Sequence, residues 1–287
     1  MLFDRAGERE AGGICEGVLI KMPSHFSTIG LPITNSEEFV ALAEKLASMA
    51  TPVKATTGTY LRWSSLCGAE VWLQVNAAND LIGMVPYFAG QSEVRVGITH
   101  RVPRDGDSHL EGALHGWADP SELKVDEGCY PFVFDLVDYG CYEELRIPSV
   151  AHARIAAFAH EATTYSSPEE FRASQAETPK FGIQSFIPSG LFTPDGSKEA
   201  PRSEAVFAGQ IKRTELKNNE LTGESYYWAL IDTYGGCFDV VIDRSLPNTP
   251  PQVGGVLFGS FWLSGRLSNF TKGKPGFWHR MFGKKGW

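Results

Sequence analysis

The sequence lacks a long apolar run, a secretory signal and paired cysteines. No apolar run approaches the roughly 18 residues that a membrane span needs. The opening residues, MLFDRAGEREAGGICEG, have no cationic segment followed by an apolar stretch, which a secretory signal requires. The five cysteines are scattered without a C-x-x-C pair, a pattern typical of reduced thiols rather than of disulfides or a zinc site. These absences predict a soluble, cytoplasmic protein without a membrane partner.

Motifs of the common catalytic sites are absent as well. Ser64, Ser65 and Ser260 lack the G-x-S-x-G context of an activated serine. Neither of two glycine-rich phosphate-binding patterns, G-x-G-x-x-G and G-x-x-x-x-G-K, occurs in the chain. The sequence therefore predicts no cofactor, and it favours a protein that is not an enzyme.

The composition that is present favours strands and turns. The chain has 30 glycines, 17 prolines and 12% aromatic residues, which suit short strands more than long helices. Its 287 residues exceed the usual size of one domain, so two domains are expected. Residues 201–287 carry 11 Lys and Arg against 7 Asp and Glu, within a chain whose net charge is −8. The acidic remainder argues against a long polyanion lying across the whole molecule.

Hydrophobic periodicity predicts the elements of the first part. A strand is expected at 25–31, and Thr34 and Glu37 have the spacing of a capping box for a helix over 36–50, which Pro52 ends. Strands are expected at 59–65, 70–76 and 81–88, and the alternation in 70–76 predicts a sheet with one face in the core. Further strands are expected at 94–102, 109–117 and 131–138. Residues 150–163 suit either strand or helix, and a short helix is expected from Ser167.

The last part is predicted to be a small barrel. Residues 193–203 are rich in Pro, Gly and Ser and are the best linker candidate. Alternation in the segment that follows places three sets of residues inside: Phe207, Gly209 and Ile211; Phe238, Val240 and Ile242; Phe261, Leu263 and Leu267. Gly259 and Gly265 share that inner face, where glycine lets a strand curve.

These patterns predict an α+β chain: a mixed α/β N-terminal domain, with a βαβββ unit and further strands, followed by an OB-like β-barrel. The predicted parts are a leader at 1–14, the α+β domain at 15–192, the linker at 193–203, the barrel at 204–270 and a basic, aromatic tail at 271–287.

The C-terminal segment resembles an OB-fold domain. The matching features are the opening V-F-A-G-Q-I, the turn Leu221–Gly223, the strand Trp228–Asp232 with Gly235 and Gly236, and the closing 254–267. The resemblance covers about 65 residues and implies binding of single-stranded nucleic acid or oligosaccharide, or packing against a partner. A fifth strand is not evident, so either the tail supplies it or the barrel is incomplete.

Residues 25–90 look like one βαβββ module of the vicinal oxygen chelate superfamily, to which the glyoxalases belong. That resemblance implies a metal-binding His on the first strand, where His25 lies, and a Glu on the last. The last strand, 81–88, contains neither Glu nor His.

Two sets of residues are candidates for binding. Aromatic and cationic side chains of the barrel form a predicted binding surface: Tyr227, Phe258, Trp262, Arg266 and Lys212. Alternation puts Phe258, Trp262 and Arg266 on the outer face, where single strands stack on OB barrels or a domain contact covers them. Burial in a contact is favoured. The second set is His109 and Glu111, about 6.8 Å apart if they lie on one strand, with His25 or His100 as a third metal ligand.

The function that the sequence favours is non-catalytic binding or interaction, with the ligand unknown. Single-stranded nucleic-acid binding through the OB-like domain is the alternative, and a metal-dependent enzyme of vicinal oxygen chelate type is the second alternative. A domain or subunit contact is the expected partner, while nucleic acid and a small molecule both stay open.

Overall fold

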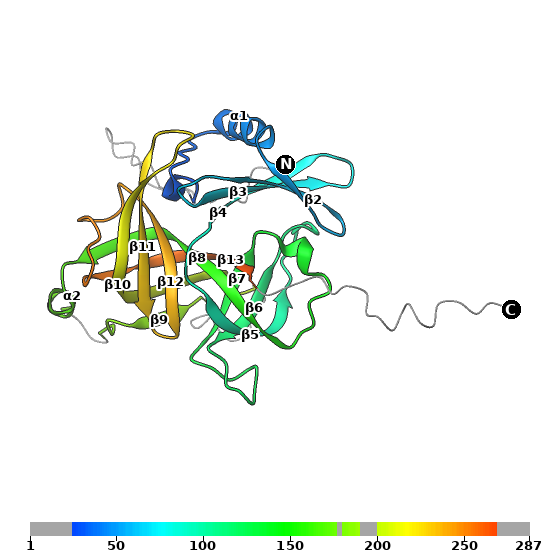
Figure 1. The fold of residues 1–287 in the computed structure, drawn as a ribbon. Coiled ribbons are helices and arrows are strands. Elements are labelled where there is room, and N and C mark those ends of the chain that lie inside the picture. Colours follow the sequence, from blue (N-terminus) through cyan, green and yellow to red (C-terminus); the bar gives the residue numbers. More distant parts are fainter. Residues whose placement is uncertain (1–24, 177–179, 190–199, 269–287) are drawn as a thin grey trace.

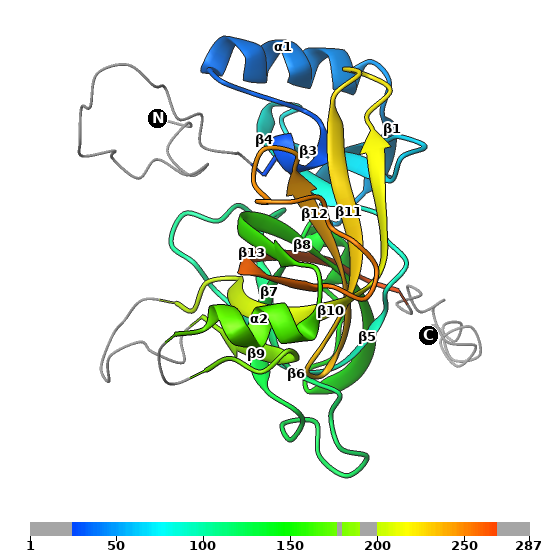
Figure 2. The ribbon, with the colours of Figure 1, turned by 90° about the vertical axis from the view of Figure 1, so that its left-hand side faces the viewer.

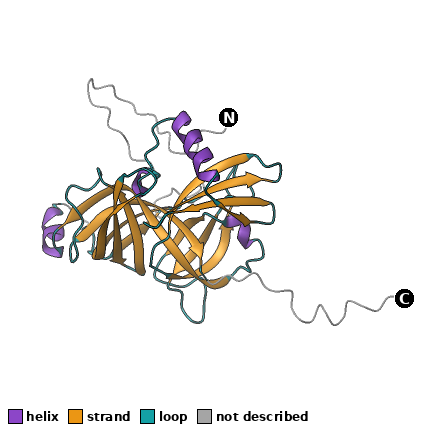
Figure 3. Ribbon diagram, turned by 45° about the horizontal axis from the view of Figure 1, so that its top comes forward, coloured by secondary structure: helices purple, strands orange, loops and turns teal. Residues whose placement is uncertain are grey.

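Strands dominate the protein. The computed structural model describes residues 25–176, 180–189 and 200–268, so the expected leader and tail lie outside the described residues. The described part contains thirteen strands and two α-helices (Figure 3). The prediction of an α+β chain with a mixed α/β N-terminal domain was therefore wrong. Residues 150–163, where strand and helix were both open, belong to a 17-residue strand with partners on both sides.

The first unit is a four-stranded antiparallel sheet with one helix, called here the N-terminal sheet (Figure 1). Its elements are α1 (Ser36–Ala47), β1 (Thr51–Lys54), β2 (Gly58–Ser64), β3 (Ala69–Asn76) and β4 (Leu81–Phe88). The capping residue is Asn35, whose side chain accepts from the Glu38 amide, one position later than predicted. Pro52 does not stop the helix, which already ends at Ala47. It lies in β1, an edge strand, where a missing backbone N–H is tolerated.

Residues 25–31 do not form the expected strand. They contain a 3₁₀ turn, η1 (Ser27–Ile29), which ends at Gly30 with a φ of 74°. The turn lies against the tip of a long hairpin: the Asn219 amide donates to the Ile29 carbonyl over 2.8 Å, and the Thr222 hydroxyl donates to the Gly30 carbonyl over 2.6 Å. The βαβββ order that suggested a vicinal oxygen chelate module thus lacks its first strand.

Strand β3 is buried on both faces, whereas one solvent-facing side was predicted. Six of its eight residues are buried, including Glu70, Trp72 and Gln74. Helix α1 lies over one face of the N-terminal sheet, and the larger sheet lies under the other (Figures 1 and 2). The apolar and polar residues of β3 do alternate as predicted, but its polar side chains face a second layer of protein and not solvent.

The second unit is a nine-stranded sheet of mixed direction. Its strands are β5 (Val94–Val102), β6 (Ala113–Ala118), β7 (Pro131–Leu136), β8 (Ser149–Tyr165), β9 (Ser185–Pro188), β10 (Glu204–Asn218), β11 (Ser225–Thr233), β12 (Gly236–Asp243) and β13 (Val256–Leu267). A 3₁₀ turn, η2 (Tyr139–Tyr142), precedes β8, and α2 (Pro168–Ser174) follows it with Ser167 as its cap, as predicted. Neither described α-helix is long and apolar enough to cross a membrane.

This sheet closes into two rings that share two strands. The first ring contains β5, β6, β7, β13 and β8, and its one parallel pair is β7–β13. The second ring contains β10, β11, β12, β8 and β13, and its one parallel pair is β12–β8. Each ring thus consists of a three-stranded meander and the shared strands, so the chain repeats one arrangement twice.

The shared strands cross the boundary predicted at 193–203. Strand β13 pairs with β8 from Val256 opposite Tyr165 to Leu267 opposite Ala153, so β8 is the fifth strand that the C-terminal segment lacked. Most of the predicted linker lies outside the described residues, but Ser203 is buried and its carbonyl accepts from the Leu263 amide. Independent folding of the two predicted domains stays a prediction.

One apolar core fills both rings. The predicted inward side chains of the second ring are all in it: Phe207, Ile211, Phe238, Val240, Ile242, Phe261, Leu263 and Leu267. Gly259 is required by close approach, because a Cβ there would overlap the Glu161 carbonyl of β8. The inner face of the barrel was therefore predicted correctly.

A trough beside the shared strands as candidate functional site

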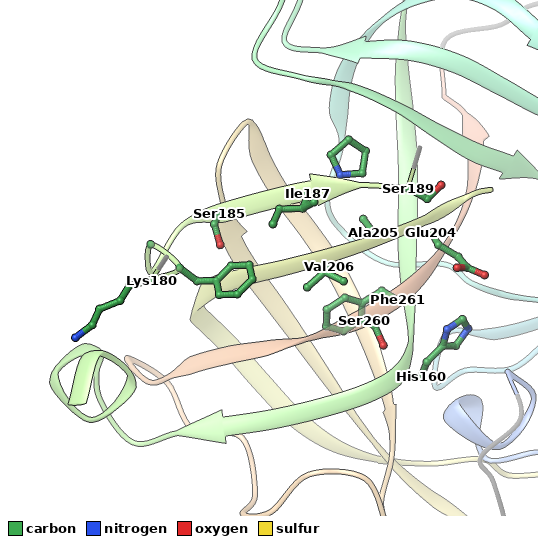
Figure 4. Close-up of a pocket in the computed structure, with 13 residues that line it drawn as sticks. His160, Lys180, Ser185, Ile187, Ser189, Glu204, Ala205, Val206, Ser260 and Phe261 are labelled. Atoms are coloured by element: carbon green, nitrogen blue, oxygen red, sulfur yellow. The ribbon is translucent and has the colours of Figure 1, made fainter. Parts of the chain in front are cut away.

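A cavity of about 550 Å³ opens on the outer face of β9, β10 and β13, beside β8 (Figure 4). Its floor follows from strand register: Val206 of β10 lies opposite both Ile187 of β9 and Ser260 of β13. Because opposed residues share a face of the sheet, these three side chains form one row. The row is visible across the middle of Figure 4. This cavity is called the trough below.

Aromatic side chains bound one end of the trough. Phe181 lines it and contacts Phe258, with ring centroids 5.0 Å apart. Phe258 in turn contacts Phe171 of α2 at 6.1 Å. Phe171 is buried with Ala208 and Val256 in a small separate cluster. Helix α2, fixed by its Ser167 cap, therefore supports this apolar wall.

A β-bulge positions the opposite end. Ser260 pairs with Glu161 and Phe261 pairs with Ala159, so His160 is the extra residue of β8. A bulge redirects a side chain away from regular alternation, and His160 lines the trough. Its Nε2 lies 2.6 Å from Nε2 of His25. The His25 ring stacks on Trp262 with centroids 4.5 Å apart. It does not line the trough itself but supports His160, which forms the end wall.

The polar groups of the trough are few, and apart from Ser260 in the floor they lie near its ends. His160, Glu204 and Ser189 lie toward one end, and Ser185 and Lys180 toward the other (Figure 4). The Ser185 hydroxyl is buried and has no hydrogen-bond partner among the described residues. Most of the remaining lining is apolar, from Phe181, Ile187, Pro188, Ala205, Val206 and Phe261.

The predicted binding surface is not one surface. Phe258 and Trp262 lie on the outer face as predicted, but Ser260 and the trough separate them. Tyr227 lies on the same face of β11 as Ala229 and Ile231, so its side chain packs against the core that fills the rings. The ammonium group of Lys212 lies 3.0 Å from the carboxylate of Asp232.

Arg266 lies under the N-terminal sheet rather than in the open. Its guanidinium lies over the Trp72 ring at 4.6 Å and donates to Asp138 over 2.9 Å. Burial raises the pKa of Asp138, and Arg266 opposes that effect. Trp262 donates from its indole nitrogen to Asp135 over 2.7 Å, and Asp135 also pairs with Arg104 at 2.7 Å. Arg266 therefore joins the two sheets, whereas Trp262 bonds within its own sheet and packs against the apolar cluster of the N-terminal sheet.

The candidate metal ligands are not brought together. Strand β6 begins at Ala113, so His109 and Glu111 lie in the loop before it and not on the predicted strand. The Glu111 carboxylate accepts from the Ser108 amide over 3.0 Å, while His25 contacts His160. Among the described residues no cluster of three or more His, Cys, Asp or Glu side chains has the arrangement of a metal site.

A second histidine pair lies on the outer face of the first ring. His100 and His115 are opposed residues of β5 and β6, and their rings stack with centroids 4.4 Å apart. The Thr99 hydroxyl lies 3.0 Å and 2.6 Å from their Nδ1 atoms. Burial, and then His100, lower the pKa of His115 to about 4. Trp117 follows on the same face of β6.

Sequence reasoning missed the residues that define the trough. Nothing in the sequence marked His160, because a bulge leaves no trace in local alternation. Glu204 and Ile187 flank the linker candidate and gave no signal of their own. No family model, curated protein or solved structure matches this chain.

Proposed function

We propose that this protein binds a small, largely apolar molecule in the trough. The observation that carries the proposal is the combination of volume and lining. A cavity of about 550 Å³ falls within the range of roughly 300–1,000 Å³ that is typical of ligand sites. Such sites combine an apolar lining with a few polar groups that orient the ligand, and the trough has this composition.

The polar groups suggest how the ligand is oriented. Glu204 and His160 lie near the same end, so a hydrogen-bond donor such as an amine or hydroxyl suits that end. The apolar body of the ligand would lie along Val206 and Ile187 toward Phe181. An arylamine meets both requirements, and N-phenyl-1-naphthylamine is a fluorescent member of this class.

The test is a titration with N-phenyl-1-naphthylamine, followed by its fluorescence. We expect saturable binding that Val206→Trp abolishes, because an indole at the centre of the floor fills the trough. Val150→Trp is the matched control, since Val150 is 43% exposed and is not among the residues that line the trough. Equal binding by both variants would exclude the trough as the site.

We propose, as a second candidate, that the first ring is an OB-type barrel and that it binds single-stranded nucleic acid. A specific observation favours it: in this ring the meander β5–β6–β7 precedes β8 and β13 in the chain and is closed by one parallel pair, β7–β13, which is the Greek-key arrangement of OB folds. OB folds bind strands across the face of their second and third strands. In the first ring these are β6 and β7, and β6 carries His115 and Trp117 there.

Fluorescence anisotropy with a labelled 20-nucleotide oligo(dT) tests this second candidate. If the first ring binds it, Trp117→Ala should cost about 1–3 kcal/mol of binding free energy, the usual value of one stacked base. Binding should also weaken steeply with salt. Trp262→Ala should leave the affinity unchanged, because that indole lies under His25. No binding at low salt would exclude this function.

A further inference from the structure

The two imidazoles of His25 and His160 share an in-line hydrogen bond. Their Nε2 atoms are 2.6 Å apart, the ring centroids are 4.8 Å apart and the ring planes differ by 13°. The centroid separation exceeds the nitrogen separation by about two ring radii, so the rings meet edge to edge and not face to face. One Nε2 therefore donates its proton and the other accepts it.

The pair joins two segments that are far apart in the sequence. His25 lies just before the η1 turn, and the Thr28 hydroxyl donates to its carbonyl over 2.7 Å. His160 is the bulged residue at the end of the trough. The His25 ring also packs against Trp262 and Phe158, whose centroids are 4.5 Å and 6.2 Å away. Segment 25–31 is thereby held against the end wall of the trough.

We propose that the His25–His160 pair is a proton-operated latch that regulates ligand binding in the trough. This inference rests on the proposed function of the trough. While both rings are neutral, one donor faces one acceptor. When both rings are protonated, two donors and two positive charges face each other across 2.6 Å, and the contact is lost. His25 then leaves Trp262, and the end wall opens.

Among the residues that the structure describes, charged side chains lie on the elements around the pair. Glu204 of β10 lies opposite Trp262 and lines the same end of the trough as His160. Asp135 of β7 is held by the Trp262 indole and by Arg104. Glu161 of β8 is exposed, and Arg266 of β13 is paired with Asp138. No charged side chain belongs to the η1 turn itself.

The direction of the pH effect follows from His25. Burial, and then His160, lower the pKa of His25 from 6.5 to about 3 while it is docked. A group with a lowered histidine pKa stabilises the docked state fully above about pH 6.5 and loses that contribution as the pH falls toward 3. The ratio of docked to undocked segment is therefore nearly constant above pH 6.5 and falls about tenfold per pH unit below it, which gives about thirtyfold at pH 5 relative to pH 8.

The Trp262 indole resonance in ¹H–¹⁵N NMR reads the latch without any ligand. In the wild type we expect it to move away from its neutral-pH position between pH 6.5 and 4.5. His25→Phe keeps a ring on Trp262 but cannot be protonated, so its indole resonance should stay in place over that range. His109→Phe, in an exposed loop, is the matched control and should behave as the wild type. Should phenylalanine prevent folding, His25→Gln provides a second non-titrating variant.

Binding of N-phenyl-1-naphthylamine reads the consequence for the trough. Its dissociation constant should rise by up to about thirtyfold from pH 8 to pH 5 in the wild type, the limit set by the latch, and should stay constant in His25→Phe. A probe that does not bind at any pH would overturn the proposed function, whereas the indole resonance would still test the latch. The same movement of that resonance in the wild type and in His25→Phe would overturn the latch.

Discussion

The two rings share two strands, yet their outer faces differ. In the second ring, Tyr226 and Trp228 of β11 and Val241 of β12 face outward and are buried in one cluster with the N-terminal sheet. In the first ring, His115 and Trp117 of β6 face outward and stay partly exposed, and His100 is exposed. The strands are similar in kind, so the position of the N-terminal sheet decides which face becomes core.

Charged side chains on a covered face need hydrogen-bond partners within the protein. Asp239 of β12 is buried, accepts from the Trp228 indole over 2.7 Å and accepts from the amide and the hydroxyl of Ser92 over 2.6 Å each. Glu70 is likewise buried and pairs with Arg62 and the Trp72 indole. Within the described part of the chain no second sheet lies over Trp117, which stays partly exposed.

The largest expected effect comes from truncating Trp72, a buried residue of the N-terminal sheet that covers the second ring. Trp72→Ala should cost about 3–5 kcal/mol of unfolding free energy, the usual range for a fully buried tryptophan. Trp117→Ala, on the uncovered ring, should cost clearly less, about 1–2 kcal/mol, because that side chain is only partly buried. Urea unfolding of both variants measures the contrast. Similar losses would mean that the two faces do not differ as described.

Removing a buried carboxylate should have a somewhat smaller effect. Asp239→Ala leaves the Trp228 indole and the Ser92 amide without their acceptor, and each buried unsatisfied donor costs about 1–3 kcal/mol. We expect a loss of about 2–4 kcal/mol in urea unfolding. Asp126→Ala, in an exposed loop of the first ring, is the control and should be nearly neutral. A neutral Asp239→Ala would show that the cover is not anchored there.

Trp262→Ala tests the end of the trough. The indole is half-buried, stacks under His25 and donates to Asp135, so we expect a loss of about 2–3 kcal/mol, below the value for a fully buried tryptophan. Thermal and urea unfolding measure this loss, and oligo(dT) anisotropy should show no binding through this residue. A stable variant that loses tight oligonucleotide binding would instead place a stacking platform on the second ring.

Local periodicity predicted the strands well and their partners poorly. Strands β4 and β5 begin and end at the predicted residues, 81–88 and 94–102, because each alternates over its full length. The inner face of the second ring was predicted for the same reason. The pairing of β8 with β13 joins residues about a hundred positions apart, and no local pattern in 149–165 indicates that partner.

The candidate site could not be predicted because tertiary contacts create it. The bulge that presents His160 depends on the register between β8 and β13. The η1 turn replaces a strand at 25–31 because Gly30 takes a left-handed conformation against Asn219 and Tyr226, although HFSTIGL has the composition of a strand. Tyr227 was assigned to the binding surface together with other aromatic residues. Only the closed ring shows that its side chain points inward.

The smallest expected effect compares the two histidine pairs. Burial lowers the pKa of His115 to about 4 and that of His25 to about 3, so both histidines stabilise the folded protein fully above about pH 6.5 and lose this contribution at lower pH. His115 is partly exposed, so water reduces its effect. The urea midpoint should fall from pH 7 to pH 4.5 in the wild type, fall slightly less in His115→Phe and clearly less in His25→Phe. His109→Phe should follow the wild type. If His115→Phe reduced the fall of the urea midpoint more than His25→Phe does, the stronger pH-sensitive group would lie on the uncovered ring.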